Sequence, residues 1–144
     1  MNDPHKVLLL GSSGLLGRSL TAAVTRCGWR SDTPDENQLD LTRPGAVDRF
    51  LSRQDYAAVI NAAAYTDVTG AERADQHDAV MRLYRVAPRE LARACARSGL
   101  PLIHVSTDYV FDGSKGEPYR EEDPVATLQV YGRSKLEGEQ AVLD

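Results

Sequence analysis

Val7-Leu8-Leu9-Leu10-Gly11-Ser12-Ser13-Gly14-Leu15-Leu16-Gly17 is the stretch that decides the fold, and it stands near the start of the 144-residue sequence. Its four aliphatic residues predict a buried strand, and the pattern after the glycines predicts a helix from Leu15 to about Arg26. Gly11 permits a tight bend, Gly14 lets backbone approach a phosphate, and Gly17 lets the helix pack closely. Such a turn can hold a pyrophosphate, although glycines also occur in turns with a purely structural role.

Strand and helix patterns alternate along the rest of the chain, which predicts a parallel, doubly wound α/β sheet in one domain over residues 1–144. Further strands are expected within Trp29–Gln38 and at Leu39–Leu41, Tyr56–Ile60 and Leu100–Ser106. Further helices are expected from near Pro44, over Asp78–Ser98 with an interruption at Pro88, and from Gln129 onward. Right-handed crossovers then predict the strand order 3-2-1-4-5.

The composition excludes several classes of partner. The net charge is −4 and no long basic run occurs, so neither nucleic acid nor an anionic membrane is expected as a partner. The first apolar run has four residues, too few for a signal peptide or a membrane span, so a cytoplasmic location is expected. Cys27 and Cys95 are predicted to be free, buried thiols. No metal site is expected, because ligand spacing is absent among His5, His77 and His104.

A second motif, Tyr131-Gly132-Arg133-Ser134-Lys135, places a phenol and an ammonium one helical turn apart. A phenol is a weak acid at neutral pH, and a neighbouring ammonium favours its phenolate form. Tyr131 could therefore pass a proton to a carbonyl oxygen while a nicotinamide delivers hydride, and Lys135 could bind the nicotinamide ribose. Ser106-Thr107-Asp108 would supply a hydroxyl at a strand end. The alternative is a surface Tyr–Lys pair.

Three more positions each allow two interpretations. Asp35 lies near the distance of about 20 residues at which an acidic residue binds the adenosine ribose and favours NADH, or it belongs to a solvated loop. Asn61-Ala62-Ala63-Ala64 could let a flat cofactor lie against the sheet, or could serve tight packing. His104, within an apolar strand, is expected to be a core or edge histidine rather than a catalyst.

These motifs together resemble the extended short-chain dehydrogenase/reductase family. The resemblance is carried by Leu8–Gly17, Leu39–Thr42, Val59–Glu72, His104–Gly113 and Tyr131–Glu139. It implies a Rossmann-type, NAD(P)-binding domain that uses NADH or NADPH to reduce the 4-keto group of a dTDP-6-deoxy sugar nucleotide. The same pattern occurs in a regulatory subunit of methionine adenosyltransferase, so a dinucleotide-binding module or regulatory subunit without turnover is the alternative.

The resemblance also implies roles for single residues. Thr107, Tyr131 and Lys135 would be catalytic, and Thr107 and Asp108 would touch the sugar nucleotide. The cofactor would be bound by Gly11, Gly14, Leu15, Leu16, Gly17, Asp35, Asp40, Leu41, Ala63, Ala64, Tyr65, Tyr131 and Lys135.

Three departures from the family pattern stand out. Arg30–Pro34 replaces the usual aliphatic second strand, and Tyr84 replaces an asparagine, which weakens the hydrogen-bond support of the site. The match covers only the N-terminal part of family members, so the last strands and the C-terminal substrate-binding lobe are expected to be absent. The Leu100–Ser106 strand would then have an open apolar edge, which favours association of the chain with itself.

Overall fold

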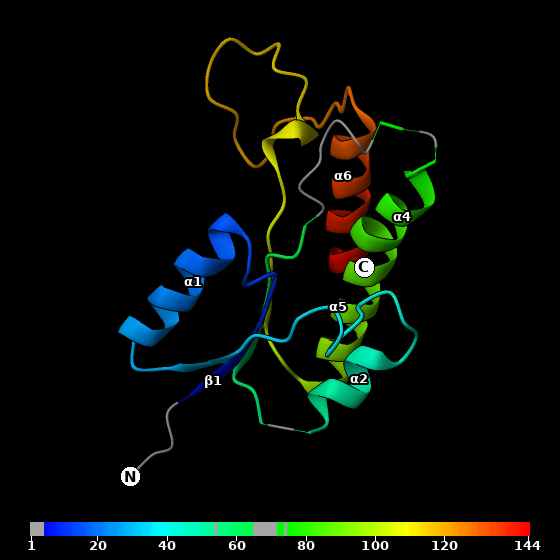
Figure 1. The fold of residues 1–144 in the computed structure, drawn as a ribbon. Coiled ribbons are helices and arrows are strands. Elements are labelled where there is room, and N and C mark those ends of the chain that lie inside the picture. The colour runs from blue at the N-terminus through cyan, green and yellow to red at the C-terminus, as the bar shows by residue number, and fades with distance from the viewer. Residues whose placement is uncertain (1–4, 54, 65–71, 74) are drawn as a thin grey trace.

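A computed structural model describes residues 5–53, 55–64, 72–73 and 75–144. Within them, four strands form one sheet in the order β2-β1-β3-β4. The strands are β1 (Lys6–Leu10), β2 (Arg30–Asp32), β3 (Ala58–Asn61) and β4 (Leu102–His104). All three pairings are parallel, with Leu8 opposite both Asp32 and Val59. The expected parallel α/β sheet with the first strand in its interior is confirmed (Figure 1).

The expected strand order 3-2-1-4-5 is wrong in one element. Leu39–Leu41 forms no strand, so the described sheet has four strands and ends at β2. The Asp40 carboxylate accepts hydrogen bonds from the Thr42 amide (2.8 Å) and hydroxyl (2.7 Å), which curls the backbone into a turn. Leu39 points into the core instead, at 6% exposure.

β2 forms although its sequence is polar. Asp32 accepts a hydrogen bond from the Tyr56 hydroxyl at 2.6 Å and pairs with Lys6 at 3.0 Å. Burial raises the pKa of Asp32, but the hydrogen bonds from Tyr56 and Lys6 outweigh burial and lower it overall. These partners stabilise a strand that intrinsic propensity disfavours.

The helices are α1 (Leu15–Arg26), α2 (Ala46–Leu51), α4 (His77–Met81), α5 (Ala87–Ser98) and α6 (Val130–Leu143). A π-helical turn, η1 (Arg82–Val86), joins α4 to α5, and a single 3₁₀ turn, η2 (Asp108–Val110), follows β4. The expected interruption near Pro88 is therefore a π-helical turn that ends just before the proline. Pro88 lies in the first turn of α5 and donates no N–H, and the turn before it is π-helical, with the Ala87 amide bonded to the Arg82 carbonyl.

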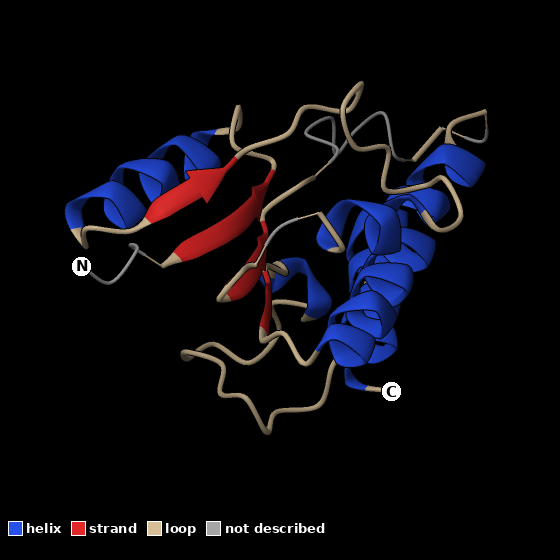
Figure 2. Ribbon diagram, turned by 90° about the horizontal axis from the view of Figure 1, so that it is seen from below, coloured by secondary structure: helices blue, strands red, loops and turns tan. Residues whose placement is uncertain are grey.

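The helices lie on both sides of the sheet: α1 on one, and α2, α5 and α6 on the other (Figures 1 and 2). Leu8 and Leu10 of β1 belong to the main core cluster together with residues of the second group. The cluster consists of Leu8, Leu10, Leu39, Val47, Leu51, Tyr56, Val59, Leu91, Ala94 and Cys95. Val7 and Leu9 alternate with Leu8 and Leu10 along the strand and are also buried, so β1 is the covered centre of the sheet.

The cysteine prediction holds for one residue of the two. Cys95 is buried in α5, and burial raises the pKa of its thiol to about 11. Cys27 is exposed, because it follows the last turn of α1 rather than facing the sheet. In the part of the chain that the structure describes, no helix is both long and apolar enough to cross a membrane, and no group of metal-ligating side chains gathers.

Candidate functional site

The glycine turn joins β1 to α1 at the carboxyl end of the sheet. Gly11 has φ +77°, and a Cβ there would lie 2.5 Å from the Ala62 carbonyl oxygen and the Ala63 nitrogen. A Cβ at Gly17 would collide with the Gly11 carbonyl oxygen. Gly11 and Gly17 are therefore required by the packing of the protein itself. The atoms that Gly11 approaches belong to the backbone of Ala62 and Ala63, so both interpretations of the small side chains after β3 stay predictions.

Gly14 differs from these two glycines. Its φ is −68°, which any residue adopts, and a Cβ would meet only the Gly11 carbonyl oxygen at 3.4 Å. Gly14 is the N-cap of α1 and makes no side-chain capping bond, so the first turn of the helix presents unsatisfied N–H groups. Leu15 and Leu16 of that turn are 81% and 46% exposed. The first turn of α1 is exposed and uncapped, and the fold does not require a glycine at position 14. The helix start therefore leaves room for an anionic ligand.

Asn61 connects the ends of three strands. Its side-chain oxygen accepts a hydrogen bond from the Ala63 amide at 3.1 Å, next to the contact with Gly11. Its side-chain nitrogen lies 3.0 Å from Nδ1 of His104 on β4. Burial, and then the charge of Lys135, lowers the pKa of His104 to about 4, so the ring is neutral at neutral pH. His104 thus lies half-buried on the edge strand, where the sequence placed it.

Tyr131 and Lys135 lie one turn apart on α6, and Lys135 is only 2% exposed. The Lys135 ammonium donates a hydrogen bond to the Val105 carbonyl at 2.7 Å, just beyond β4. The interpretation as a surface Tyr–Lys pair is therefore wrong for the lysine. Burial lowers the pKa of Lys135, although Glu139 opposes this shift.

Two glycines set the position of α6. A Cβ at Gly132 would collide with the Tyr109 carbonyl oxygen, and a Cβ at Gly138 would collide with the Tyr84 carbonyl oxygen. The helix therefore contacts η2 near one end and η1 near the other, with Lys135 between the two contacts. At the helix start, the Glu72 carboxylate accepts a hydrogen bond from the Tyr131 amide at 3.2 Å, where negative charge is favoured.

Thr107 and Asp108 belong to the start of η2, the turn that contacts α6 at Gly132. The Thr107 hydroxyl oxygen accepts a hydrogen bond from the Tyr109 amide at 3.3 Å and so caps η2. The Tyr109 ring meets the Tyr131 ring edge-on, with centroids 5.7 Å apart. Asp108 is exposed.

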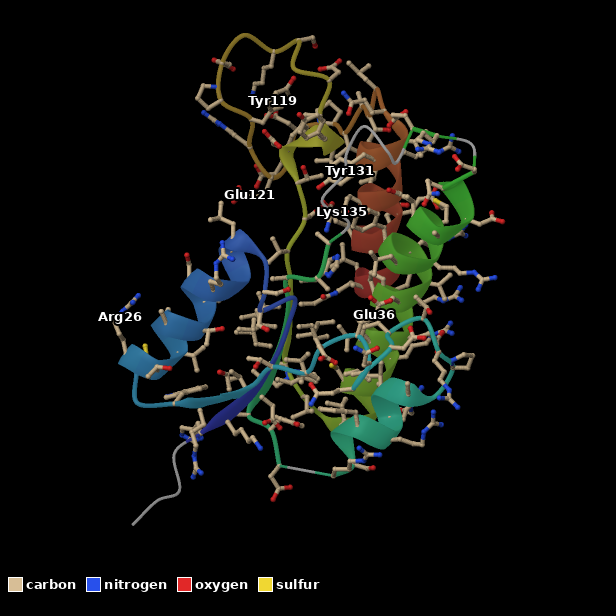
Figure 3. All side chains as sticks on the ribbon, in the orientation of Figure 1. Arg26, Glu36, Tyr119, Glu121, Tyr131 and Lys135 are labelled. Atoms are coloured by element: carbon tan, nitrogen blue, oxygen red, sulfur yellow. The ribbon has the colours of Figure 1, made fainter. Side chains whose placement is uncertain are left out.

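A continuous set of contacts thus runs along the carboxyl end of the sheet. The glycine turn contacts Ala62 and Ala63, Asn61 contacts His104, and Val105 receives the Lys135 ammonium. Figure 3 shows Tyr131 and Lys135 on α6 at the same end of the sheet as the start of α1. The two sequence motifs are therefore brought to one edge.

A cavity of about 340 Å³ opens next to Tyr109, and sequence reasoning missed it. Phe111 and Tyr119 stack with centroids 4.2 Å apart, and the Tyr119 hydroxyl donates to Asp112 at 2.9 Å. The cavity is lined by Asp108, Tyr109, Phe111, Asp112, Gly113, Tyr119, Leu128 and Gln129. The only sequence signal was the pair of aromatic residues flanking a polar loop.

Of the remaining expected cofactor residues, Ala64 is exposed after β3, and the others lie after β2 or outside the described residues. Asp35 is exposed, and its carboxylate accepts a hydrogen bond from the Gln38 amide at 2.9 Å. Hydrogen bonds from the hydroxyl and then the amide of Thr42 hold the pKa of Asp40 below its usual range. Leu41 packs against the core. Tyr65 falls outside the described residues.

A parallel sheet with a glycine turn after its first strand, and a Tyr–Lys pair at the same edge, defines a Rossmann-like α/β domain. The chain belongs to the family described as RmlD substrate binding domain, whose sequence profile matches residues 5–144. This membership confirms the resemblance drawn from the motifs.

Individual relatives agree with that assignment. A dTDP-4-dehydrorhamnose reductase of Mycobacterium tuberculosis is 48% identical over 144 residues, covering 96% of this chain and 46% of the relative. The crystal structure of dTDP-4-dehydrorhamnose reductase from Bacillus anthracis in complex with NADP superposes with a TM-score of 0.91 at 31% identity, covering 99% of this chain and 50% of the other.

A relative of a different kind is the methionine adenosyltransferase 2 subunit beta of Pongo abelii, 37% identical over 152 residues, covering all of this chain and 45% of the relative. The chain thus spans about half the length of the curated relatives that it matches.

Proposed function

We propose that this chain is the nucleotide-binding part of an NAD(P)H-dependent reductase that converts dTDP-4-dehydrorhamnose to dTDP-L-rhamnose. The observation that carries the proposal is the meeting of two motifs at one edge of the sheet. An open helix start at Gly14 and a buried ammonium at Lys135 are joined there by Asn61 and the residues after β3. Relatives named as dTDP-4-dehydrorhamnose reductases support the choice of substrate.

The residues present fit a dinucleotide. The N–H groups at the start of α1, behind Gly14, would hold the pyrophosphate. Asp35, Asp40 and Leu41, after β2, would lie on the adenosine side. The nicotinamide side would be lined by Ala63 and Ala64, whereas Tyr65, which the resemblance also implies, lies outside the described residues. When bound, NADH or NADPH supplies the hydride that adds to the ketone carbon.

Residues of this chain would transfer the proton that the ketone oxygen takes up. Tyr131 would pass its phenolic proton to the ketone oxygen, and the positive charge of Lys135 would stabilise the phenolate left behind. The Thr107 hydroxyl accepts from the Tyr109 amide and donates to the Asp108 carboxylate at 3.4 Å, so its proton would turn from Asp108 to the same ketone oxygen when substrate binds. Asp108 and the aromatic cavity beside it would hold the sugar nucleotide.

A second function, dinucleotide binding without turnover, is favoured by the relationship to a methionine adenosyltransferase subunit. Among the described residues, the cavity is lined by residues between 108 and 129 and not by Tyr131 or Lys135, which supports binding without turnover as well. Hydride transfer needs the ketone held at about 3–3.5 Å from the donor, which requires a closed cleft.

Titration with NADH, followed by fluorescence, and turnover with a dTDP-4-keto-6-deoxy sugar test both functions. We expect this chain to bind NADH weakly and to reduce the sugar slowly or not at all. Gly14→Asp should weaken NADH binding by about tenfold or more, because a carboxylate would occupy the pyrophosphate position.

Ala22→Asp is the matched control, since it adds the same charge on the exposed face of the same helix. Equal affinity of Gly14→Asp and wild type for NADH would refute the phosphate role. Rapid turnover by this chain would show that the described cleft is sufficient for catalysis.

A further inference from the structure

Tyr84 lies at the centre of the contacts around Lys135. It sits in the π-helical turn η1 and is 1% exposed. Its ring centroid is 5.1 Å from the Lys135 ammonium nitrogen and 5.6 Å from the Tyr131 ring centroid, with the two rings edge to face. One aromatic side chain therefore touches both members of the pair that the proposed function uses.

The π-helical turn explains how this side chain comes to point at α6. A π-helical turn contains one more residue than an α-helical one, which shifts the side chains that follow around the helix axis. The Tyr84 backbone is held as well, because its carbonyl oxygen lies against Gly138, where a Cβ would collide. Backbone and ring of Tyr84 thus contact α6 at Gly138, Lys135 and Tyr131.

The charge on Lys135 explains what the ring does. A buried ammonium has lost water and needs partners for three N–H donors. Among the described residues, its one hydrogen-bond acceptor is the Val105 carbonyl. The face of an aromatic ring attracts a cation without using a fixed acceptor atom. The ring can therefore hold the ammonium on one side and leave an N–H free for a ligand.

We infer that Tyr84 is a positioning residue: its ring fixes the Lys135 ammonium and the Tyr131 ring in the geometry that a bound dinucleotide meets. This inference rests on the proposed function for the identity of the ligand. The held geometry itself does not, since it is formed by contacts among residues of this chain.

Variants at position 84 separate the ring from the bulk of the side chain. Tyr84→Phe keeps the ring, and Tyr84→Leu removes it. Pentafluorophenylalanine at position 84 keeps the shape but removes the negative face of the ring. Tyr56→Leu is the matched control, because Tyr56 is also a buried tyrosine beside a lysine, with Lys6 5.6 Å from its centroid.

The first measurement needs no cofactor. The rate at which an acetyl N-hydroxysuccinimide ester modifies Lys135 is followed by peptide mass spectrometry, with Lys115 as the internal reference. We expect Tyr84→Leu and the fluorinated ring to raise that rate by about threefold to thirtyfold, which is the range of a cation–π contact. Tyr84→Phe and Tyr56→Leu should stay within about twofold of wild type.

The second measurement is NADH affinity. It should fall in Tyr84→Leu and in the fluorinated protein, and Tyr84→Phe should bind NADH like the wild type. Unchanged Lys135 modification in Tyr84→Leu and in the fluorinated protein would overturn the inference and leave Tyr84 a packing residue. A rise in Lys135 modification in Tyr84→Phe as large as that in Tyr84→Leu would overturn it as well, since the hydroxyl would then be responsible. Wild-type protein that fails to bind NADH, with Lys135 still released in Tyr84→Leu, would refute the proposed function and retain the positioning role.

Discussion

At this edge of the sheet, single side chains are held in place by hydrogen bonds and charges rather than by hydrophobic packing. His104 is an example, because its ring receives a hydrogen bond from Asn61 only while Nδ1 carries no proton. The nearby Lys135 charge and the burial of the ring both act against a second proton. The neutral form of His104 is therefore part of the folded structure.

The pH dependence of folding follows from this residue. The pKa of His104 is about 4 in the folded protein and 6.5 is its ordinary value, so the unfolded chain binds the proton more readily. His104 therefore favours the folded state above about pH 6.5, and we expect this contribution to be lost as the pH falls toward 4. Urea unfolding at about pH 7 and pH 4.5 should show a loss on the order of 1–3 kcal/mol that His104→Gln lacks.

His104→Gln is informative because its amide can still bond Asn61 but does not titrate in this range. If the wild type and His104→Gln lose the same unfolding free energy on acidification, the effect belongs to the carboxylates instead.

At the scale of elements, α6 is the piece whose placement creates the site. Its two contact glycines lie against carbonyl groups of η2 and η1, and Glu72 accepts a hydrogen bond at its start. Its neighbours are the helix α5 and two irregular turns, the π-helical η1 and the 3₁₀ turn η2. Its contacts with the two turns depend on close backbone approach at Gly132 and Gly138, beside the packed rings of Tyr84, Tyr109 and Tyr131.

Gly138→Ala tests this dependence. The new methyl group would collide with the Tyr84 carbonyl, and overpacking of this kind costs about 1–3 kcal/mol. Alanine would gain roughly 1 kcal/mol of helix propensity, so a net loss of unfolding free energy shows that the contact dominates. Urea denaturation measures it, and Gly14→Ala, whose methyl would lie 3.4 Å from Gly11, is the mild comparison. A net gain of stability would mean that α6 can shift away from η1 without cost.

At the scale of the whole molecule, the described sheet is covered at its centre and has an edge strand on each side, β2 and β4. β1 is buried on both faces, whereas β4 is an edge strand whose Ile103 is 57% exposed. An edge strand with an exposed aliphatic side chain is a template for pairing with another chain.

We therefore expect this chain to associate with itself at micromolar concentration. Ile103→Lys should shift it toward the monomer in analytical ultracentrifugation, since a charge on an edge strand opposes pairing. Leu143→Lys, which removes an even more exposed aliphatic residue (86%) from the end of α6, should not. A purely monomeric wild-type chain would contradict the expected association.

The sequence by itself determined the elements whose signals lie within a few adjacent residues. The first strand, the glycine turn and α1 were predicted nearly to the residue, because periodicity and glycine spacing act locally. The Tyr–Lys spacing on α6 and the position of His104 on an apolar strand were predicted for the same reason.

The tertiary structure alone decided the features that depend on a distant partner. Leu39–Leu41 could form a strand only by pairing with β2, and the local hydrogen bonds of Asp40 prevailed instead. Lys135 can be buried because the Val105 carbonyl accepts a hydrogen bond from its ammonium and the Tyr84 ring lies against the same charge. Neither residue lies near Lys135 in the sequence. The roles of Gly132 and Gly138 became visible only when η2 and η1 were placed against them, since a glycine required by a neighbour gives no local signal.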